Sequence, residues 1–403
     1  MNILQICNKP PFPAVDGGAI AMNNTTQGLL NNGHKVTVIA ITTPKHPVIY
    51  GGLTKEYMEN TNLQTVFIDT SIRLRDAFFN LFTKKSYNVE RFISVDFTRH
   101  LQKILTQENF DIVLVESLFV TPYISTIKSI SKAKIVLRAH NVEHKIWERI
   151  SENTKNPIKK QYINLLAKRL KKYEIEVFKT IDGIAAMTKV DVNNFKELGF
   201  KKEIEAIPTG YIISSKEDCE KKNVEENSIF HIASMDWLPN IEGVDWFLNN
   251  VWPIISNTKN NAKLYLAGRE MPQFYYNLNL HNVTIVGKVK SAKEFYLSKK
   301  IMIVPVLSGS GMRIKIIEGM ALGKIIISTS LGAEGISYTS GKNILIADTP
   351  QDFADAICKC LNDSNYCDKI GENAKELITS EYSNEQISKK MVSFFEYLKA
   401  GDK

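Results

Sequence analysis

The feature that most constrains the fold is an alternation of short apolar runs with amphipathic helical patterns along almost the whole chain. The apolar runs are continuous, which is typical of parallel strands covered by helices on both faces. Two such series predict an α/β protein with two doubly wound, Rossmann-like domains that face each other across a cleft. Strands are expected at 2–7, 35–41, 65–69, 111–116, 134–139 and 183–187, and then at 228–234, 263–268, 283–287, 300–306, 324–329 and 343–348.

The boundary between the two series is a polar, charged stretch at 206–228, as expected of a linker. We therefore predict an N-terminal domain over 1–207 and a C-terminal domain over 208–380. A helical pattern in the remaining segment, 381–403, carries an apolar stripe. Two packings stay open for that helix, one on its own domain and one back on the first domain. The stripe consists of Ile387, Met391, Phe394, Phe395 and Leu398.

The composition excludes several classes of protein. Hydrophobic residues make up 44% and charged residues 23% of the 403 residues, as in ordinary globular proteins. No apolar run reaches the roughly 18 residues of a membrane-spanning helix. The start, "MNILQICNKP", resembles a strand rather than a signal peptide, so we expect a cytoplasmic protein. The net charge of +8 suits anionic substrates or an anionic membrane surface and does not require nucleic acid.

The five cysteines do not predict a disulfide framework or a metal site. Cys358, Cys360 and Cys367 lie on a predicted helix pair with no nearby histidine, and a C-x-C pair alone is a weak metal signal. His140 and His144 are spaced like helical zinc ligands, but the pattern is not H-E-x-x-H and no third ligand is visible. We therefore expect free thiols, no metal and no cofactor.

In the first half, two strand ends carry candidate site residues, because ligands of open parallel sheets bind beyond the carboxyl ends of the strands. Gly17 and Gly18 open a helix, where backbone amides and the helix dipole favour an anion; a plain loop-to-helix turn is the alternative. His140 directly follows the strand at 134–139, and a structural histidine is its alternative. Asn141 is expected to cap the next helix.

In the second half, "SGSGMRIKIIEGMALG" at 308–323 follows a strand and predicts a small-residue loop and a helix that begins near Met312. The loop amides, the helix dipole, Arg313 and Lys315 together form a candidate diphosphate site. Glu318 is expected to face out of the helix one turn later. It either accepts hydrogen bonds from two ribose hydroxyls or forms an ion pair with Lys315. The candidate donor-binding residues of this segment are Gly309, Ser310, Gly311, Met312, Arg313, Lys315 and Glu318.

Two segments favour a peripheral contact with anionic lipid, with a solvated basic helix face as the alternative. The segment 159–172 contains six basic residues and no acidic ones. The segment 72–85, "IRLRDAFFNLFTKK", mixes phenylalanines with arginines and lysines.

At this point the chain resembles a known family. "LLNNGHKVTVIA", "RAHNVEHKIW", "AIPTGY" and "GSGMRIKIIEGMALGKIIISTSLGAEGI" are similar to segments of the retaining glycosyltransferases of family four, also described as glycosyl transferases group 1. This resemblance extends over essentially the whole chain and is strongest to a bacterial polysaccharide-assembly branch. It implies the GT-B architecture and transfer of a sugar from a nucleotide-diphosphate sugar to a glycan or lipid-linked acceptor, with retention and without a divalent metal.

The resemblance also implies roles for individual residues. Gly17 and Gly18 would approach the donor phosphate or the acceptor, and His140 would hydrogen-bond the reacting sugar. Glu318 matches the second carboxylate of the family's E-x7-E motif and would bind the donor ribose. The first carboxylate falls at Ser310, which departs from the pattern. The usual Arg and Lys pair is also absent after the first strand of the C-terminal domain, so we expect Arg313 and Lys315 to supply that charge.

Two alternatives remain at this stage. A nucleotide-sugar epimerase of the same fold would share the donor site. A non-catalytic nucleotide-sugar-binding protein would explain Ser310 as lost chemistry. The absence of G-x-G-x-x-G disfavours a dinucleotide-dependent oxidoreductase, and the absence of G-x-x-x-x-G-K-[ST] disfavours a Walker-type nucleotidase.

Overall fold

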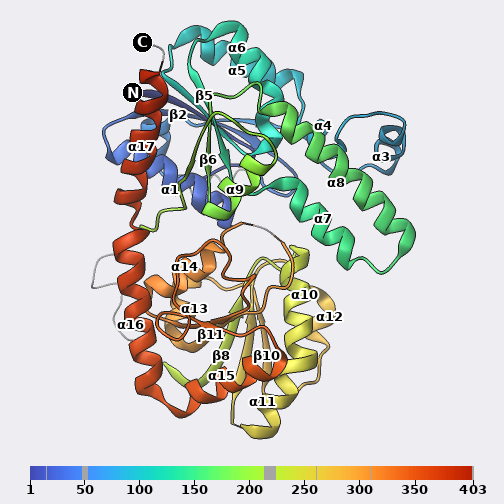
Figure 1. Ribbon diagram of the computed structural model, residues 1–403, viewed down its shortest axis with the longest axis vertical. Helices are drawn as coiled ribbons and strands as arrows, with labels where there is room; N and C mark the ends of the chain where they lie inside the picture. Colours follow the sequence, from blue (N-terminus) through green and yellow to red (C-terminus); the bar gives the residue numbers. More distant parts are fainter. Residues whose placement is uncertain (15, 48–52, 213–223, 260, 310, 402–403) are drawn as a thin grey trace. The chain divides into compact units, whose positions relative to one another are not determined.

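The computed structural model describes residues 1–14, 16–47, 53–212, 224–259, 261–309 and 311–401 (Figure 1). The chain divides into two compact units. The first comprises Met1–Gly210 together with Asn384–Lys403, and the second comprises Tyr211–Ser383. Each unit is built around its own sheet, and every strand pair in both sheets is parallel. This arrangement confirms the predicted pair of parallel α/β sheets.

The first unit holds a seven-stranded sheet in the order β3-β2-β1-β4-β5-β6-β7. Its strands are β1 (Asn2–Cys7), β2 (Lys35–Thr42), β3 (Gln64–Phe67), β4 (Ile112–Glu116), β5 (Lys134–Ala139), β6 (Gly183–Ala186) and β7 (Glu203–Ala206). Its helices are α1 (Gly17–Asn31), α2 (Lys55–Thr61), α3 (Leu74–Leu81), α4 (Tyr87–Glu90), α5 (Val95–Gln107), a 3-10 helix (Leu118–Tyr123), α6 (Ile124–Ile130), α7 (Glu143–Asn153), α8 (Pro157–Val177), α9 (Lys189–Glu197) and α17 (Asn384–Ala400).

The second unit holds a six-stranded sheet in the order β10-β9-β8-β11-β12-β13. Its strands are β8 (Glu225–Ile232), β9 (Lys263–Ala267), β10 (Val283–Gly287), β11 (Lys299–Val304), β12 (Ile325–Ser328) and β13 (Leu345–Ile346). Its helices are α10 (Leu238–Trp246), a π-helical turn (Phe247–Val251), α11 (Trp252–Thr258), α12 (Gln273–Tyr276), α13 (Ala292–Ser298), α14 (Ile314–Ala321), α15 (Pro350–Asn362) and α16 (Ser364–Glu381).

Helix α17 packs on the first unit. Met391 and Phe395 join Met22 and Leu29 of α1 in one apolar cluster on that face of the sheet. Helices α1 and α17 also approach closely at the start of α17, where Asn384 Nδ2 donates to the carbonyl of Asn24 at 3.0 Å. The first unit therefore takes its covering helices from two distant parts of the sequence.

Local signals set several of the helix starts. Asn156 caps α8 by accepting a hydrogen bond from the Lys159 amide at 3.0 Å, and Pro157 takes the first helical position, as predicted. Asp16 caps α1 in the same way, by accepting from the Ala19 amide at 2.9 Å. Strand β7 was not expected from the sequence, since its residues, EIEA, lack an apolar run at the sheet edge.

The packing of α10 against the end of β11 requires a glycine. A Cβ atom on Gly243 would lie 2.0 Å from the carbonyl oxygen of Pro305, which directly follows β11. Replacing Gly243 with alanine is therefore expected to destabilise the second unit by about 1–3 kcal/mol through overpacking. Chemical denaturation would measure the loss, with Asn249→Ala on an exposed position of the following turn as the control. Equal stability of the two variants would contradict this packing.

Candidate functional site

In the first unit, the candidate site lies at the carboxyl ends of β1, β4 and β5, which are neighbours in the sheet. Because these strands are parallel and in register, their last residues lie at one edge. Glu116 ends β4 beside Cys7 of β1 and Arg138 of β5. His140 follows β5 directly, at the position predicted for it from the strand end.

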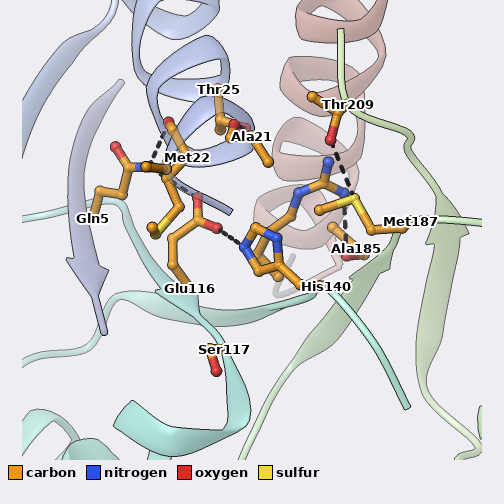
Figure 2. Close-up of polar contacts among 12 residues, drawn as sticks. Gln5, Ala21, Met22, Thr25, Glu116, Ser117, His140, Ala185, Met187 and Thr209 are labelled. Carbon is orange, nitrogen blue, oxygen red and sulfur yellow. Dashed lines mark hydrogen bonds and ion pairs between the residues drawn. The ribbon is translucent and has the colours of Figure 1, made fainter. Parts of the chain in front are cut away.

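His140 is held by a buried carboxylate (Figure 2). Its Nε2 atom lies 2.7 Å from Oε2 of Glu116, which is fully buried. Since an ionised carboxylate only accepts hydrogen bonds, the imidazole donates here. Gln5 donates from Nε2 to the other Glu116 oxygen at 2.8 Å, and Thr26 donates to Gln5 Oε1 at 2.6 Å. This chain fixes both the orientation and the tautomer of His140, as a carboxylate does for a catalytic histidine.

A second charge is buried beside Glu116. The side chain of Arg138 on β5 is 1% exposed and donates to backbone carbonyls, among them Ala185 at 3.3 Å and Pro208 at 3.1 Å. Burial lowers the pKa of Arg138 to about 10, although the charge of Glu116 opposes that shift. The guanidinium thus stays charged at neutral pH and balances the buried Glu116.

The backbone is strained directly after Glu116. Ser117 has a φ angle of 108° and a ψ angle of 149°, a region that residues with a side chain rarely adopt. Its hydroxyl accepts a hydrogen bond from the Phe119 amide at 3.3 Å and opens the 3-10 helix. Strain of this kind concentrates at functional sites, where the surrounding structure holds it in place.

Gly17 and Gly18 do open α1, as predicted, and Gly18 admits a lysine. A Cβ atom on Gly18 would lie 2.8 Å from Nζ of Lys9, whose ammonium pairs with Asp16 at 2.6 Å. Burial raises the pKa of Asp16, but hydrogen bonds from His46 and Lys9 outweigh burial and hold that pKa well below its usual value. A cation therefore lies at the α1 N-terminus. Binding of donor or acceptor by the glycine pair stays a prediction.

Helix α7 corrects one expectation. Asn141 does not cap it: the cap position is Val142, without a side-chain hydrogen bond, and Asn141 Nδ2 instead donates to Glu143 at 3.4 Å. Asn141 therefore lies one residue before the cap position of α7. His144 Nδ1 lies 2.5 Å from Glu174 on α8, and both side chains are buried. Among the described residues, no group of three or more His, Cys, Asp or Glu side chains could hold a metal ion.

A buried acid beside this pair makes the stability pH-dependent. Burial and the neighbouring Glu174 raise the pKa of Glu143 to about 8. Between the pKa of an exposed glutamate and about 8, the folded protein keeps the proton that the unfolded chain releases, so stability falls as pH rises. Glu143→Gln removes the titration. It is expected to raise the melting temperature at pH 8 and to change it little at pH 5. Thermal melts with Glu152→Gln, exposed on the same helix, as control would test this; equal gains at both pH values would contradict it.

In the second unit, the candidate site is formed by residues 307–309 and 311–313 and by α14. The helix begins at Ile314 rather than near Met312, because Arg313 adopts the extended cap conformation. Gly309 and Gly311 have positive φ angles of 99° and 84°, which lets the loop turn tightly. Ser310 lies outside the described residues, and Met312 is half-buried.

Arg313 is buried and stacks on an aromatic ring. Its guanidinium carbon lies 5.1 Å from the ring centre of Trp237, and its Nη1 donates to the carbonyl of Gly311. The Trp237 ring also limits Gly309, since a Cβ atom there would lie 2.9 Å from the ring. Arg313 thus connects the loop before α14, which carries Gly309 and Gly311, to the loop that follows β8.

Lys315 and Glu318 correct two expectations. Lys315 Nζ donates to Oδ1 of Asn240 at 2.9 Å, and the described residues contain no ion pair between Lys315 and Glu318. Glu318 does not face out but is half-buried against Tyr296 of α13. Burial lowers the pKa of Lys315 to about 7, with the charge of Arg313 adding to the shift. Burial raises the pKa of Glu318 to about 7, although a hydrogen bond with Tyr296 opposes it.

The structure adds partners that sequence reasoning missed. Ser308 donates to Glu242 at 2.5 Å, and the Tyr296 hydroxyl donates to the Lys315 carbonyl at 3.3 Å. In the first unit, Glu116 and Arg138 were visible only as charged residues at or next to the ends of apolar runs. A charged residue inside a buried strand is itself a signal, because an unpaired charge is not stable there.

Both halves of the chain match glycosyltransferase families. Residues 15–214 match the model of "Glycosyltransferase Family 4", and residues 226–363 match that of "Glycosyl transferases group 1". An uncharacterized 44.6 kDa protein in the cps region of Klebsiella pneumoniae is 23% identical over 96% of this chain and 97% of its own.

Solved structures share the fold. Sucrose-phosphate synthase from Thermosynechococcus elongatus superposes with a TM-score of 0.73 at 14% identity, with complete coverage of both chains. HepE from Anabaena, solved in complex with UDP, superposes with a TM-score of 0.65 at 12% identity over 98% of this chain and 100% of its own.

Proposed function

Because its two halves match these two models and its fold is that of the GT-B enzymes, the chain belongs to the group 1, family 4 glycosyltransferases, and we propose that it transfers a hexose with retention from a nucleotide-diphosphate sugar to a glycan or lipid-linked acceptor. Its relative in a cps region supports a role in surface polysaccharide synthesis. The observation that carries the donor proposal is the combination of glycine loop, Arg313, Lys315 and Glu318 around the start of α14.

Each group at α14 has a task in donor binding. The loop amides and the helix dipole bind phosphate oxygens, and Arg313 and Lys315 balance the diphosphate charge. Glu318, one turn further along the helix, accepts hydrogen bonds from the ribose hydroxyls. The burial of Arg313 and the partial burial of Lys315 and Glu318 strengthen these contacts, since water screens them less.

In the first unit, His140 binds the transferred sugar. Glu116 holds the imidazole, so that it presents a fixed edge to a sugar hydroxyl. In the proposed reaction, the bond from the anomeric carbon to the diphosphate oxygen breaks while the acceptor oxygen attacks from the same face. The leaving oxygen takes the acceptor proton. The protein then contributes orientation and stabilisation of the departing charge. The reaction so written calls for no divalent metal.

Donor specificity can be tested directly with a panel of nucleotide sugars. Release of a nucleoside diphosphate from one donor, dependent on an acceptor fraction, would support the transferase. Conversion of the donor to an isomer without transfer would indicate an epimerase. Binding of nucleoside diphosphate in a calorimeter without any turnover would indicate a binding protein.

Removing the two cations is expected to weaken donor binding. Each charge-assisted hydrogen bond contributes about 1.5–3 kcal/mol, so Arg313→Ala and Lys315→Ala should each lower the affinity for the nucleoside diphosphate about tenfold or more. Calorimetry would measure it, with Lys342→Ala, exposed in the same unit, as control. Thermal melts would identify loss of folding. Unchanged affinity in both folded variants would refute the assignment of the diphosphate to this helix.

A further inference from the structure

An exposed aromatic platform lies at the edge of the first unit. It comprises Phe78, Phe79 and Phe82 at the end of α3, which are 57%, 57% and 77% exposed. Their rings touch edge to face, with centres 6.0 Å apart for Phe78 and Phe79 and 5.4 Å apart for Phe78 and Phe82. Clusters of exposed aromatic side chains are rare on soluble proteins, and where they occur they often mark a binding surface.

The platform is held in place rather than left loose. Arg169 of α8 donates to the carbonyls of Asn80 and Leu81 at 2.9 and 3.0 Å, and thereby fixes the end of α3 against α8. At the start of α3, the Arg73 amide donates to the Tyr87 hydroxyl at 3.1 Å. Figure 1 shows α3 beyond α8 at the margin of this unit. The three phenylalanine side chains are exposed there.

Basic residues accompany the platform on α3 itself and on α8, the helix that holds it. Arg75 lies 5.8 Å from the centre of the Phe79 ring, and the exposed Lys84 follows Phe82 by two residues. On α8, the exposed Lys168 and Lys172 lie one residue before and three residues after Arg169, and Lys172 also forms an exposed ion pair with Glu176 at 3.9 Å. Among residues 72–85, four are basic and one, Asp76, is acidic. Aromatic rings beside cations suit the boundary between lipid headgroups and acyl chains, where the rings enter the apolar layer and the cations pair with phosphates.

We propose that α3 docks the protein on an anionic lipid bilayer, with Phe78, Phe79 and Phe82 inserted and Arg75, Lys84, Lys168 and Lys172 on the headgroups. The charge around the rings selects a lipid surface over a second copy of this chain, since two such faces would repel each other. The proposal stands on this surface alone and does not depend on the reaction proposed above. No described helix is long and apolar enough to cross a membrane.

The test uses the full chain and vesicles of phosphatidylcholine, alone or with an equal part of phosphatidylglycerol. The protein should sediment with the anionic vesicles, not with the neutral ones, and high salt should release it. Phe78→Ser with Phe82→Ser should lower the affinity at least about tenfold, given the apolar area withdrawn from the lipid. Arg75→Ser with Lys84→Ser should lower it about tenfold and weaken the salt effect.

The matched control is Phe274→Ser on α12, since Phe274 is 51% exposed in the second unit. It should bind anionic vesicles like the wild type. Equal binding by the Phe78 and Phe82 variant would overturn the proposal, as would equal binding of the wild type to neutral vesicles. A wild-type dimer in sedimentation velocity that the same variant converts to a monomer would assign the platform to a second copy and also overturn it.

Discussion

Replacing His140 with alanine is expected to lower kcat about a hundredfold or more, because it removes a preorganised hydrogen-bonding group from the reacting centre. The affinity for nucleoside diphosphate should stay unchanged, because the groups proposed to bind it are carried by α14. Initial rates with a saturating donor, together with calorimetry, would separate the two effects. His100→Ala is the matched control, since His100 is an exposed histidine of α5 in the same unit.

A variant of the buried partner tests how His140 acts. Glu116→Gln keeps the size and shape of the side chain but replaces one carboxylate oxygen with an NH2 group. In the wild type, Gln5 Nε2 and His140 Nε2 both donate to the carboxylate, and an NH2 group cannot accept either hydrogen bond. The imidazole should then lose its fixed tautomer, and kcat should fall by less than in His140→Ala, with an altered pH profile. A full rate in His140→Ala would show that the histidine is only structural.

Replacing Glu318 with glutamine is expected to lower the donor affinity about tenfold to a hundredfold, because a carboxylate that accepts two ribose hydroxyls contributes about 1.5–3 kcal/mol. The effect should appear in KM for the donor and in the affinity for the nucleoside diphosphate. Nucleoside diphosphate analogues that lack both ribose hydroxyls should bind the wild type and the variant with equal affinity. If the variant loses affinity for those mimics too, the carboxylate does not bind the ribose.

The pH dependence of donor binding follows from the same helix. The carboxyl of Glu318 has a pKa of about 7, so its charged form, the better acceptor, is gained as pH rises through 7. The ammonium of Lys315 also has a pKa of about 7, and its charge is lost over the same interval. Affinity for the nucleoside diphosphate should therefore be greatest near neutral pH. In Glu318→Gln the decline on the acid side should disappear, while the alkaline decline should remain.

The parallel sheets and the starts of α1 and α8 could be predicted because their signals are local. Continuous apolar runs identify buried strands. The pair Asn156 and Pro157 identifies the start of α8, because the cap residue and the first helical residue are adjacent in the sequence. Strand β7 escaped prediction, since an edge strand is exposed on one side and needs no apolar run. The start of α14 lies two residues later than predicted. Arg313 precedes the helix and stacks on Trp237, a residue far away in the sequence.

The surroundings of the candidate site residues required the sheet order. His140 and the loop before α14 could be located by their positions after strands. The pairing of His140 with Glu116 depends on β4 and β5 being neighbours, and the contact with Gln5 depends on β1 lying on the other side of β4. Glu318 was predicted to be exposed, because nothing near it in the sequence shows that Tyr296 covers it. Contacts between distant segments are what local patterns do not contain.

The route of the chain through the first unit has a consequence for synthesis on the ribosome. This unit needs α17 to cover Met22 and Leu29, yet α17 is translated only after all of Tyr211–Ser383. The second unit is one contiguous segment, so it can complete its core as soon as that segment leaves the ribosome. One apolar face of the first unit stays uncovered until α17 has been synthesised. The order of folding is thus expected to be the reverse of the order of translation, with α17 closing the molecule last.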